Sequence, residues 1–147
     1  MASGLTAKKL ASEIAVTMYD FDPDATTSTA VAWVDMRDFT KFMVGVMRTV
    51  GASTMTLILR AATSDAGANV QTIVTKTISD SPDAVGDYIF EECVAEQIAA
   101  VAASSGYALR YLACYLSFET GTDEAAVTYI RSGAKFKYDE LTADYVS

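Results

Sequence analysis

Residues 54–62 read Thr-Met-Thr-Leu-Ile-Leu-Arg-Ala-Ala, and this stretch decides the class of fold. Side chains alternate between the two faces of a β-strand, so Met55, Leu57 and Leu59 share one face, which is wholly apolar, while the opposite face is mixed. One apolar face and one mixed face are typical of an antiparallel sheet that packs one side on a core. The stretch therefore predicts a strand in such a sheet.

A second long strand is predicted just before it, over residues 41–49. The two strands are separated only by Val50-Gly51-Ala52-Ser53. A short connection that contains glycine favours an antiparallel hairpin. We therefore expect the strands over 41–49 and 54–62 to pair with each other.

Further strands are expected in short runs that are rich in Val, Thr, Ile, Tyr and Phe, that show period-two alternation and that are separated by turn-forming residues. They cover residues 14–19, 29–34, 70–78, 88–93, 107–118 and 125–131. The connection over 119–123 predicts a second hairpin between the last two of these strands. The strand over 107–118 is apolar or aromatic on both faces, which favours a central position or an outer face that meets another subunit.

One short helix is expected among these strands. Val94, Ile98 and Val101 recur at helical spacing among alanines until Ser104-Ser105-Gly106 ends the run. For residues 81–103 two alternatives stay open, a strand followed by this helix or one longer helix. In the first alternative the helix seals an edge or an end of the sheet.

The predicted fold is all-β: an antiparallel two-sheet β-sandwich or jelly roll with one short helix and extended terminal arms. The sandwich domain is expected over residues 13–133, with an N-terminal arm over 1–12 and a C-terminal arm over 134–147. Spaced apolar residues in the arms can gain order by docking on a partner. The candidate assembly residues are Leu5, Leu10, Phe136, Tyr138 and Tyr145.

The composition of the chain excludes several classes of function. Its 147 residues carry a formal net charge of -8, which argues against binding the phosphate backbone of nucleic acid. It has no histidine, which removes every His-based triad, His general base and mixed His/Cys zinc site. We expect no catalytic, cofactor-binding or metal-binding residues, and an enzyme built on distant carboxylates remains only a distant alternative.

Other polar and aromatic side chains are expected to have structural roles. Glu91 and Glu92 are adjacent, so they face opposite sides of a strand, and one of them is expected to pair with Arg60 or Arg110. Trp33 is expected in the core, and its alternative role is a stacking platform for a ligand. Cys93 and Cys114 lack a metal-binding spacing and are expected to be buried and apolar in character.

Nothing in the sequence predicts a membrane protein or an exported one. No apolar run approaches the roughly 18 residues that cross a bilayer. Ser12 and Glu13 interrupt the apolar stretch that a secretory signal would need after Lys8 and Lys9. Synthesis in the cytoplasm is therefore expected.

The order of these segments resembles a group of small virion structural proteins of tailed bacteriophages, of the head-decoration or capsid-associated type. Four stretches carry the resemblance: AWVDMRDF at 32–39, LILRAATSDAG at 57–67, IFEECVAEQI at 89–98 and GYALRYLA at 106–113. The first two are strands that run into a polar corner and a small-residue loop. The third is a strand that runs into a helical turn, and the fourth is the long strand.

The resemblance implies a non-enzymatic virion protein, made in the host cytoplasm, that forms homo-oligomers and binds other virion proteins such as the major capsid protein. It implies a capsid decoration or auxiliary head protein, with no nucleic-acid or membrane partner. The alternatives are a neck, connector or tail protein of the virion and a carbohydrate-binding β-sandwich module. Exposed aromatic rings would favour the carbohydrate-binding alternative.

Overall fold

A computed structural model describes residues 14–22, 26–78 and 84–134 of this chain. The two arms, with Leu5, Leu10, Phe136, Tyr138 and Tyr145, lie outside the described residues. The elements follow in the order β1 (Ala15–Phe21), β2 (Thr29–Asp35), β3 (Phe39–Val50), β4 (Met55–Ala62), β5 (Gln71–Ile78), β6 (Tyr88–Val94), α2 (Ala95–Ser105), β7 (Tyr111–Phe118) and β8 (Glu124–Ala134). Within residues 81–103, the part that is described is thus a strand followed by a short helix.

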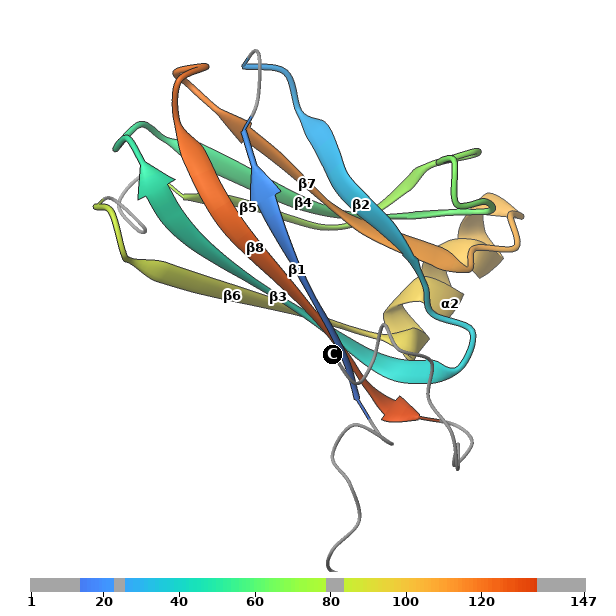
Figure 1. The fold of residues 1–147 in the computed structure, drawn as a ribbon. Coiled ribbons are helices and arrows are strands. Elements are labelled where there is room, and N and C mark those ends of the chain that lie inside the picture. Colours follow the sequence, from blue (N-terminus) through green and yellow to red (C-terminus); the bar gives the residue numbers. More distant parts are fainter. Residues whose placement is uncertain (1–13, 23–25, 79–83, 135–147) are drawn as a thin grey trace, which may run out of the picture.

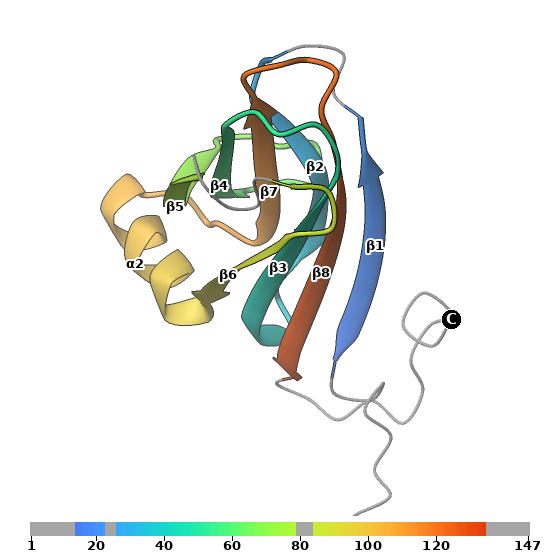
Figure 2. The same cartoon turned by 90° about the vertical axis from the view of Figure 1, so that its left-hand side faces the viewer.

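The strands form two antiparallel four-stranded sheets that pack face to face (Figures 1 and 2). We call them the β1 sheet, with the order β1-β8-β3-β6, and the β2 sheet, with the order β2-β7-β4-β5. Of the consecutive strands, only β4 and β5 pair with each other; every other connection passes from one sheet to the other. This double Greek-key arrangement is a jelly roll, which confirms the predicted class of fold.

Both predicted hairpins are wrong. β3 pairs with β6 and β8, whereas β4 pairs with β5 and β7, so the connection at 51–54 is an arch between the sheets. In the same way β7 lies in the β2 sheet and β8 in the β1 sheet, so residues 119–123 form a second arch. A short connection can form either a hairpin within one sheet or an arch between two sheets. Side chains alternate along each strand in a hairpin and in an arch, so the alternation does not distinguish them.

The core lies between the sheets, and among the described side chains all strands except β5, whose Ile73 and Val74 are only partly buried, contribute buried residues to it. Met55, Leu57 and Leu59 are fully buried, as their alternation predicts. From β7, the residues of one strand face are also buried, namely Leu112, Cys114, Leu116 and Phe118. Burial of large aliphatic and aromatic side chains from both sheets supplies the main force that holds the sandwich together.

One tyrosine joins the two sheets through hydrogen bonds inside this core. Tyr129 points inward from β8, and its hydroxyl accepts a hydrogen bond of 2.8 Å from the backbone amide of Cys114 in β7. The same hydroxyl donates to the carbonyl of Ala32 in β2 over 3.0 Å. A break in the pairing register of β2 lies between Ala30 and Trp33, at that carbonyl. The bonds to the buried hydroxyl therefore fix β8 to both β2 and β7.

A buried ion pair holds the two arches together. Arg48, at the end of β3, is 1% exposed, and its Nη1 lies 2.9 Å from Oδ2 of Asp123 in the second arch. The same carboxylate oxygen accepts a hydrogen bond of 3.0 Å from the backbone amide of Ser53 in the first arch. Arg48 also donates to the carbonyl of Ser53, so Arg48 of β3 and one residue from each arch form one polar network.

Helix α2 lies beside the sandwich, at the end of the molecule where β6 ends (Figures 1 and 2). It begins directly after β6, where the backbone amide of Val94 donates to the side-chain carbonyl of Gln97 over 2.9 Å. Ile98 is its only buried residue. After the helix, residues 107–110 form a connection, so β7 begins at Tyr111, four residues later than the predicted strand.

Candidate functional site

Two surface features have the chemistry of binding sites, and the first is the outer face of the β1 sheet. The pairing registers align three rows of side chains across this sheet: Val16-Ile130-Met43-Glu92, Met18-Thr128-Gly45-Phe90 and Asp20-Ala126-Met47-Tyr88. Nine of the twelve residues in these rows are apolar, and we call them the apolar face. It consists of Val16, Met18, Met43, Gly45, Met47, Tyr88, Phe90, Ala126 and Ile130.

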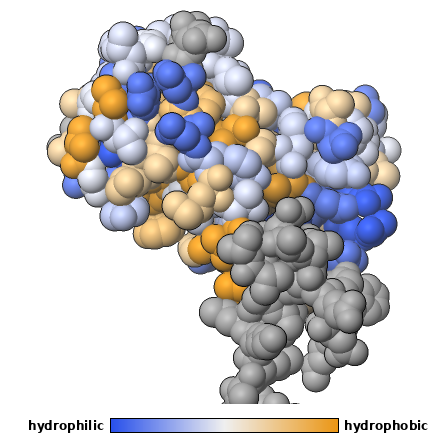
Figure 3. Space-filling view, viewed as in Figure 1, coloured by the Kyte–Doolittle hydropathy of each residue, from blue (hydrophilic) through white to orange (hydrophobic). Residues whose placement is uncertain are grey.

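The apolar face is open to solvent along its two edge strands, whereas its centre on β8 and β3 is partly buried or buried. Met18 is 73% exposed, Tyr88 is 61% exposed and Phe90 is 55% exposed. Figure 3 views the molecule from this side and shows hydrophobic residues interspersed with hydrophilic ones on this surface. Among the polar members of the three rows, the acidic residues Asp20 and Glu92 stand at diagonally opposite corners.

The size of the apolar face is that of a functional patch. Spacings of about 4.8 Å between strands and about 6.8 Å between alternate residues give each position about 33 Å² of sheet surface. The nine positions of the apolar face therefore present about 300 Å², a size at which an apolar surface patch is often functional. Its methionines have flexible, polarisable side chains that adapt to a partner's shape.

Tyr88 and Phe90 form the aromatic part of the apolar face. They lie two residues apart on β6, their ring planes are within 1° of each other, and their centroids are 6.2 Å apart. The ring of Phe90 lies over Gly45 of the neighbouring strand, where a β-carbon would approach within 2.9 Å of the ring. The absence of a side chain at Gly45 therefore permits the position of Phe90.

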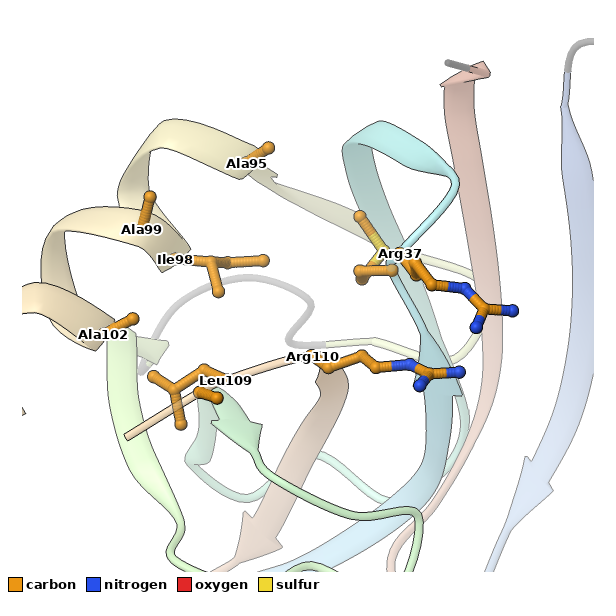
Figure 4. Close-up of a pocket in the computed structure, with 9 residues that line it drawn as sticks. Arg37, Ala95, Ile98, Ala99, Ala102, Leu109 and Arg110 are labelled. Carbon is orange, nitrogen blue, oxygen red and sulfur yellow. The ribbon is translucent and has the colours of Figure 1, made fainter. Parts of the chain in front are cut away.

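The second feature is a groove beside α2, which we call the α2 groove, with a volume of about 570 Å³. Its apolar walls come from the helix, from the corner between β2 and β3 and from the connection before β7. The lining residues are Met36, Arg37, Ala95, Ile98, Ala99, Ala102, Ala108, Leu109 and Arg110. In Figure 4 the side chains of Ile98 and Ala102 lie opposite Leu109 across the groove.

One end of the α2 groove is cationic. The guanidinium groups of Arg37 and Arg110 point to the same side, away from the helix (Figure 4). Arg110 donates from Nε and Nη2 to the carboxylate of Asp35, with 3.0 Å between Nε and each carboxylate oxygen. These hydrogen bonds hold the pKa of Asp35 below its ordinary value, against the opposing effect of burial. Arg37 has a side chain that is 62% exposed and lies 3.8 Å from Asp38, a weak pairing at the surface.

The C-terminal end of β8 lies next to this cationic end. Arg131 donates from Nη1 to the carbonyl of Asp35 over 2.9 Å. Three residues later, Ala134 is the register partner of Phe39, whose backbone amide donates to the carbonyl of Met36. The chain therefore leaves the sandwich beside the residues that line the α2 groove.

The structure corrects the position of Trp33. It lies on the face of β2 opposite the buried Val34, so it is half-buried on the outside of the β2 sheet and is not a core residue. Its ring packs edge-on against Tyr115 with 5.8 Å between centroids, and the loop after β4 approaches it closely at Gly67. The guanidinium group of Arg60 lies over the same Tyr115 ring, 4.5 Å from its centre. These contacts make Trp33 part of a packed cluster.

The predicted pairing of a glutamate with a cation is correct, but the partner is different. Glu91 pairs with Lys76 of β5, with 3.2 Å between Nζ and Oε2, across the edge where the two sheets meet. Arg60 and Arg110 make the contacts described above. Cys93 and Cys114 are free and buried, as predicted, and burial raises the pKa of the Cys93 thiol to about 11 and that of Cys114 further.

Sequence analysis missed the apolar face and the α2 groove. A signal for the face is visible in β3, where Met43 and Met47 alternate with the inward Phe42, Val44 and Val46. Both faces of that strand are apolar, as in β7. No local signal predicts the groove, because its walls come from three separate segments. Within residues 14–22, 26–78 and 84–134, no group of three metal-ligating side chains could hold an ion, and no helix there is long and apolar enough to cross a membrane.

Comparison with known proteins gives similarities of structure only. No protein-family model matches the sequence, and no curated protein sequence matches it. A pilus protein of Bacillus endospore appendages aligns with a TM-score of 0.44 at 9% identity, over 81% of this chain and 86% of its own. The SPBc2 prophage-derived protein YomS aligns with a TM-score of 0.43 at 10% identity, over 81% and 95%.

A third similar structure is VP2 of infectious bursal disease virus, from a subviral particle. It aligns with a TM-score of 0.43 at 10% identity, over 81% of this chain and 32% of the VP2 chain. At these identities and TM-scores, the similarities carry no function across to this chain.

Proposed function

We propose that this chain is a non-enzymatic structural protein of a tailed-bacteriophage virion, a decoration or auxiliary head protein that self-associates and binds the capsid shell. The observation that carries the proposal is the apolar face of the β1 sheet. An exposed patch that is continuous over four strands is costly in water and is stabilised when a partner covers it. The resemblance of the sequence to small phage virion proteins supplies the setting.

A second copy of the chain is the proposed first occupant of the apolar face. A sheet face can bind its own copy around a two-fold axis, because each residue then meets a residue of the same apolar set. Met18 and Phe90, at opposite edges of the central row, would both be covered in such a pair. The candidate arm residues Leu5, Leu10, Phe136, Tyr138 and Tyr145 are proposed as additional anchors to copies or to the shell.

Sedimentation velocity of charged variants tests self-association. Met18→Glu and Phe90→Glu place a carboxylate on the face at exposed positions, so folding is expected to be retained and association to weaken at least tenfold. Thr75→Glu, at an exposed position of β5 in the other sheet, is the matched control and is expected to associate like the wild type. Unchanged association of both face variants would contradict the proposed role of this surface.

The location in the virion has its own test. Quantitative mass spectrometry of purified particles is expected to find the chain in many copies, and wild-type protein is expected to rebind particles that lack it. Deletion of residues 134–147 is expected to lower this rebinding. Absence of the chain from purified particles would refute the virion role. It would not contradict self-association, which sedimentation velocity tests separately.

A second function, carbohydrate binding, is favoured by one observation. The exposed, parallel rings of Tyr88 and Phe90 offer apolar surfaces on which the faces of sugar rings can pack. Titration of oligosaccharides followed by calorimetry separates the two functions. A carbohydrate-binding module would bind a glycan and lose that binding in Phe90→Ala, whereas an assembly surface binds none.

A further inference from the structure

We propose that the α2 groove binds the C-terminal segment, residues 135–147, of a neighbouring copy, and that two copies exchange these segments reciprocally. This inference rests on the proposed self-association and adds to it a second contact with a defined receptor site. It is carried by the chemistry of the groove, by the sequence of the segment and by the point at which the chain leaves β8.

The groove and the segment have complementary chemistry. The groove has walls formed by Ile98, Leu109 and alanines, with Arg37 and Arg110 at one end. In an acidic chain with only 11 basic residues, such a site selects an acidic segment that also carries apolar side chains. Residues 139–145 read Asp-Glu-Leu-Thr-Ala-Asp-Tyr, so they place Leu141 and Tyr145 among three carboxylates.

The place where the segment begins favours reciprocal exchange. Ala134 pairs with Phe39, next to the corner that lines the groove, so the end of β8 lies close to the groove (Figure 1). A two-fold axis near that end would bring each segment to the groove of the other copy, and the two contacts would be identical. Thirteen residues of extended chain can reach up to about 43 Å, which is ample for such a crossing.

The area of the apolar face also calls for a second contact. The face presents about 300 Å² per copy, whereas a stable pair of proteins buries about 800 Å² on each partner. Two exchanged segments, each with a tyrosine and a leucine in an apolar groove, would add area of the required kind. The face and the grooves together are therefore expected to make a dimer that neither makes alone.

Mixing of complementary variants tests the exchange in the full-length chain. Ala99→Glu places a carboxylate on the groove wall, while Leu141→Asp with Tyr145→Asp removes the apolar anchors of the segment. Each variant alone is expected to raise the dimer Kd at least tenfold, as measured by sedimentation velocity. An equal mixture is expected to form heterodimers more tightly than either variant forms homodimers, because the intact segment of one copy meets the intact groove of the other.

Controls separate this inference from the proposed function. Ala103→Glu adds the same charge at an exposed helix position that does not line the groove, and it is expected to leave the Kd unchanged. If the mixture is no tighter than the separate variants, or if Ala103→Glu weakens the dimer as much as Ala99→Glu does, segment exchange is overturned. If only Met18→Glu weakens the dimer, exchange is overturned and the assembly role of the apolar face stands. A wild-type chain that stays monomeric at all concentrations overturns both.

Discussion

Removal of the Asp123 carboxylate should destabilise the protein more than most single substitutions. Asp123→Ala leaves the Arg48 guanidinium, which is 1% exposed, without its buried anionic partner. It also removes the acceptor of the backbone amide and hydroxyl of Ser53. Loss of one partner of a buried ion pair costs about 3–5 kcal/mol, because the remaining charge stays desolvated.

Urea unfolding followed by circular dichroism measures this cost. A domain of this size has a free energy of unfolding of about 5–15 kcal/mol, so the loss should move the transition midpoint substantially or unfold the chain. Arg48→Met combined with Asp123→Ala removes both charges, and it should cost less than the sum of the two single variants. A loss below about 1 kcal/mol for Asp123→Ala would refute the reasoning, since that is the value of an exposed pair.

The pH dependence of stability gives an independent check. Burial raises the pKa of Asp123, but hydrogen bonds from Ser53 and the charge of Arg48 outweigh it and leave the pKa below its ordinary value of 3.8. The stabilisation from this carboxylate is therefore complete well above pH 3.8 and is lost as the pH falls through the lower folded-state pKa. Asp123→Asn should flatten the acid limb of the stability curve, whereas an unchanged limb would contradict this assignment.

Three further substitutions or reactions test the interior. Tyr129→Phe leaves the buried amide of Cys114 without its acceptor, and it should lower the free energy of unfolding in urea by about 1–3 kcal/mol. An unchanged free energy of unfolding would contradict the role of this hydroxyl in joining the sheets. Gly51→Ala should also destabilise the chain in thermal unfolding, because φ is +87° and a β-carbon would collide with Asp123; an unchanged melting temperature would argue against that arch geometry. Ellman's reagent should label Cys93 and Cys114 only after unfolding, because both thiols are buried and their pKa values are raised; rapid labelling of the native chain would contradict this burial.

Alternation along each strand was sufficient to predict the class of fold, but not which strands pair. Met55, Leu57 and Leu59 face the core as their spacing predicts. The predicted hairpins failed because the contacts that decide between a hairpin and an arch are distant in sequence. Arg48 and Asp123 lie 75 residues apart, and no local pattern links them.

Local sequence patterns also fail to predict the surroundings of single residues in the candidate site. Trp33 is large and apolar, which favours burial in the core. In the structure, Tyr115 and the loop at Gly67 cover it on the outside of the sheet, so its partners come from two other elements. The apolar walls of the α2 groove likewise come from three segments, and only the folded chain brings them together.

The pairing of β1 with β8 has a consequence for the order in which the molecule is made. Ala15 is the register partner of Arg131, so the first strand has no place in a sheet until β8 has left the ribosome. Folding dominated by such long-range contacts is slow and close to all-or-none. Val16 and Met18 join Tyr88 and Phe90 on the same sheet face, at its opposite edge, only at that last stage. The apolar face that we propose as an assembly surface is therefore complete only after β8 has been made and β1 has paired with it.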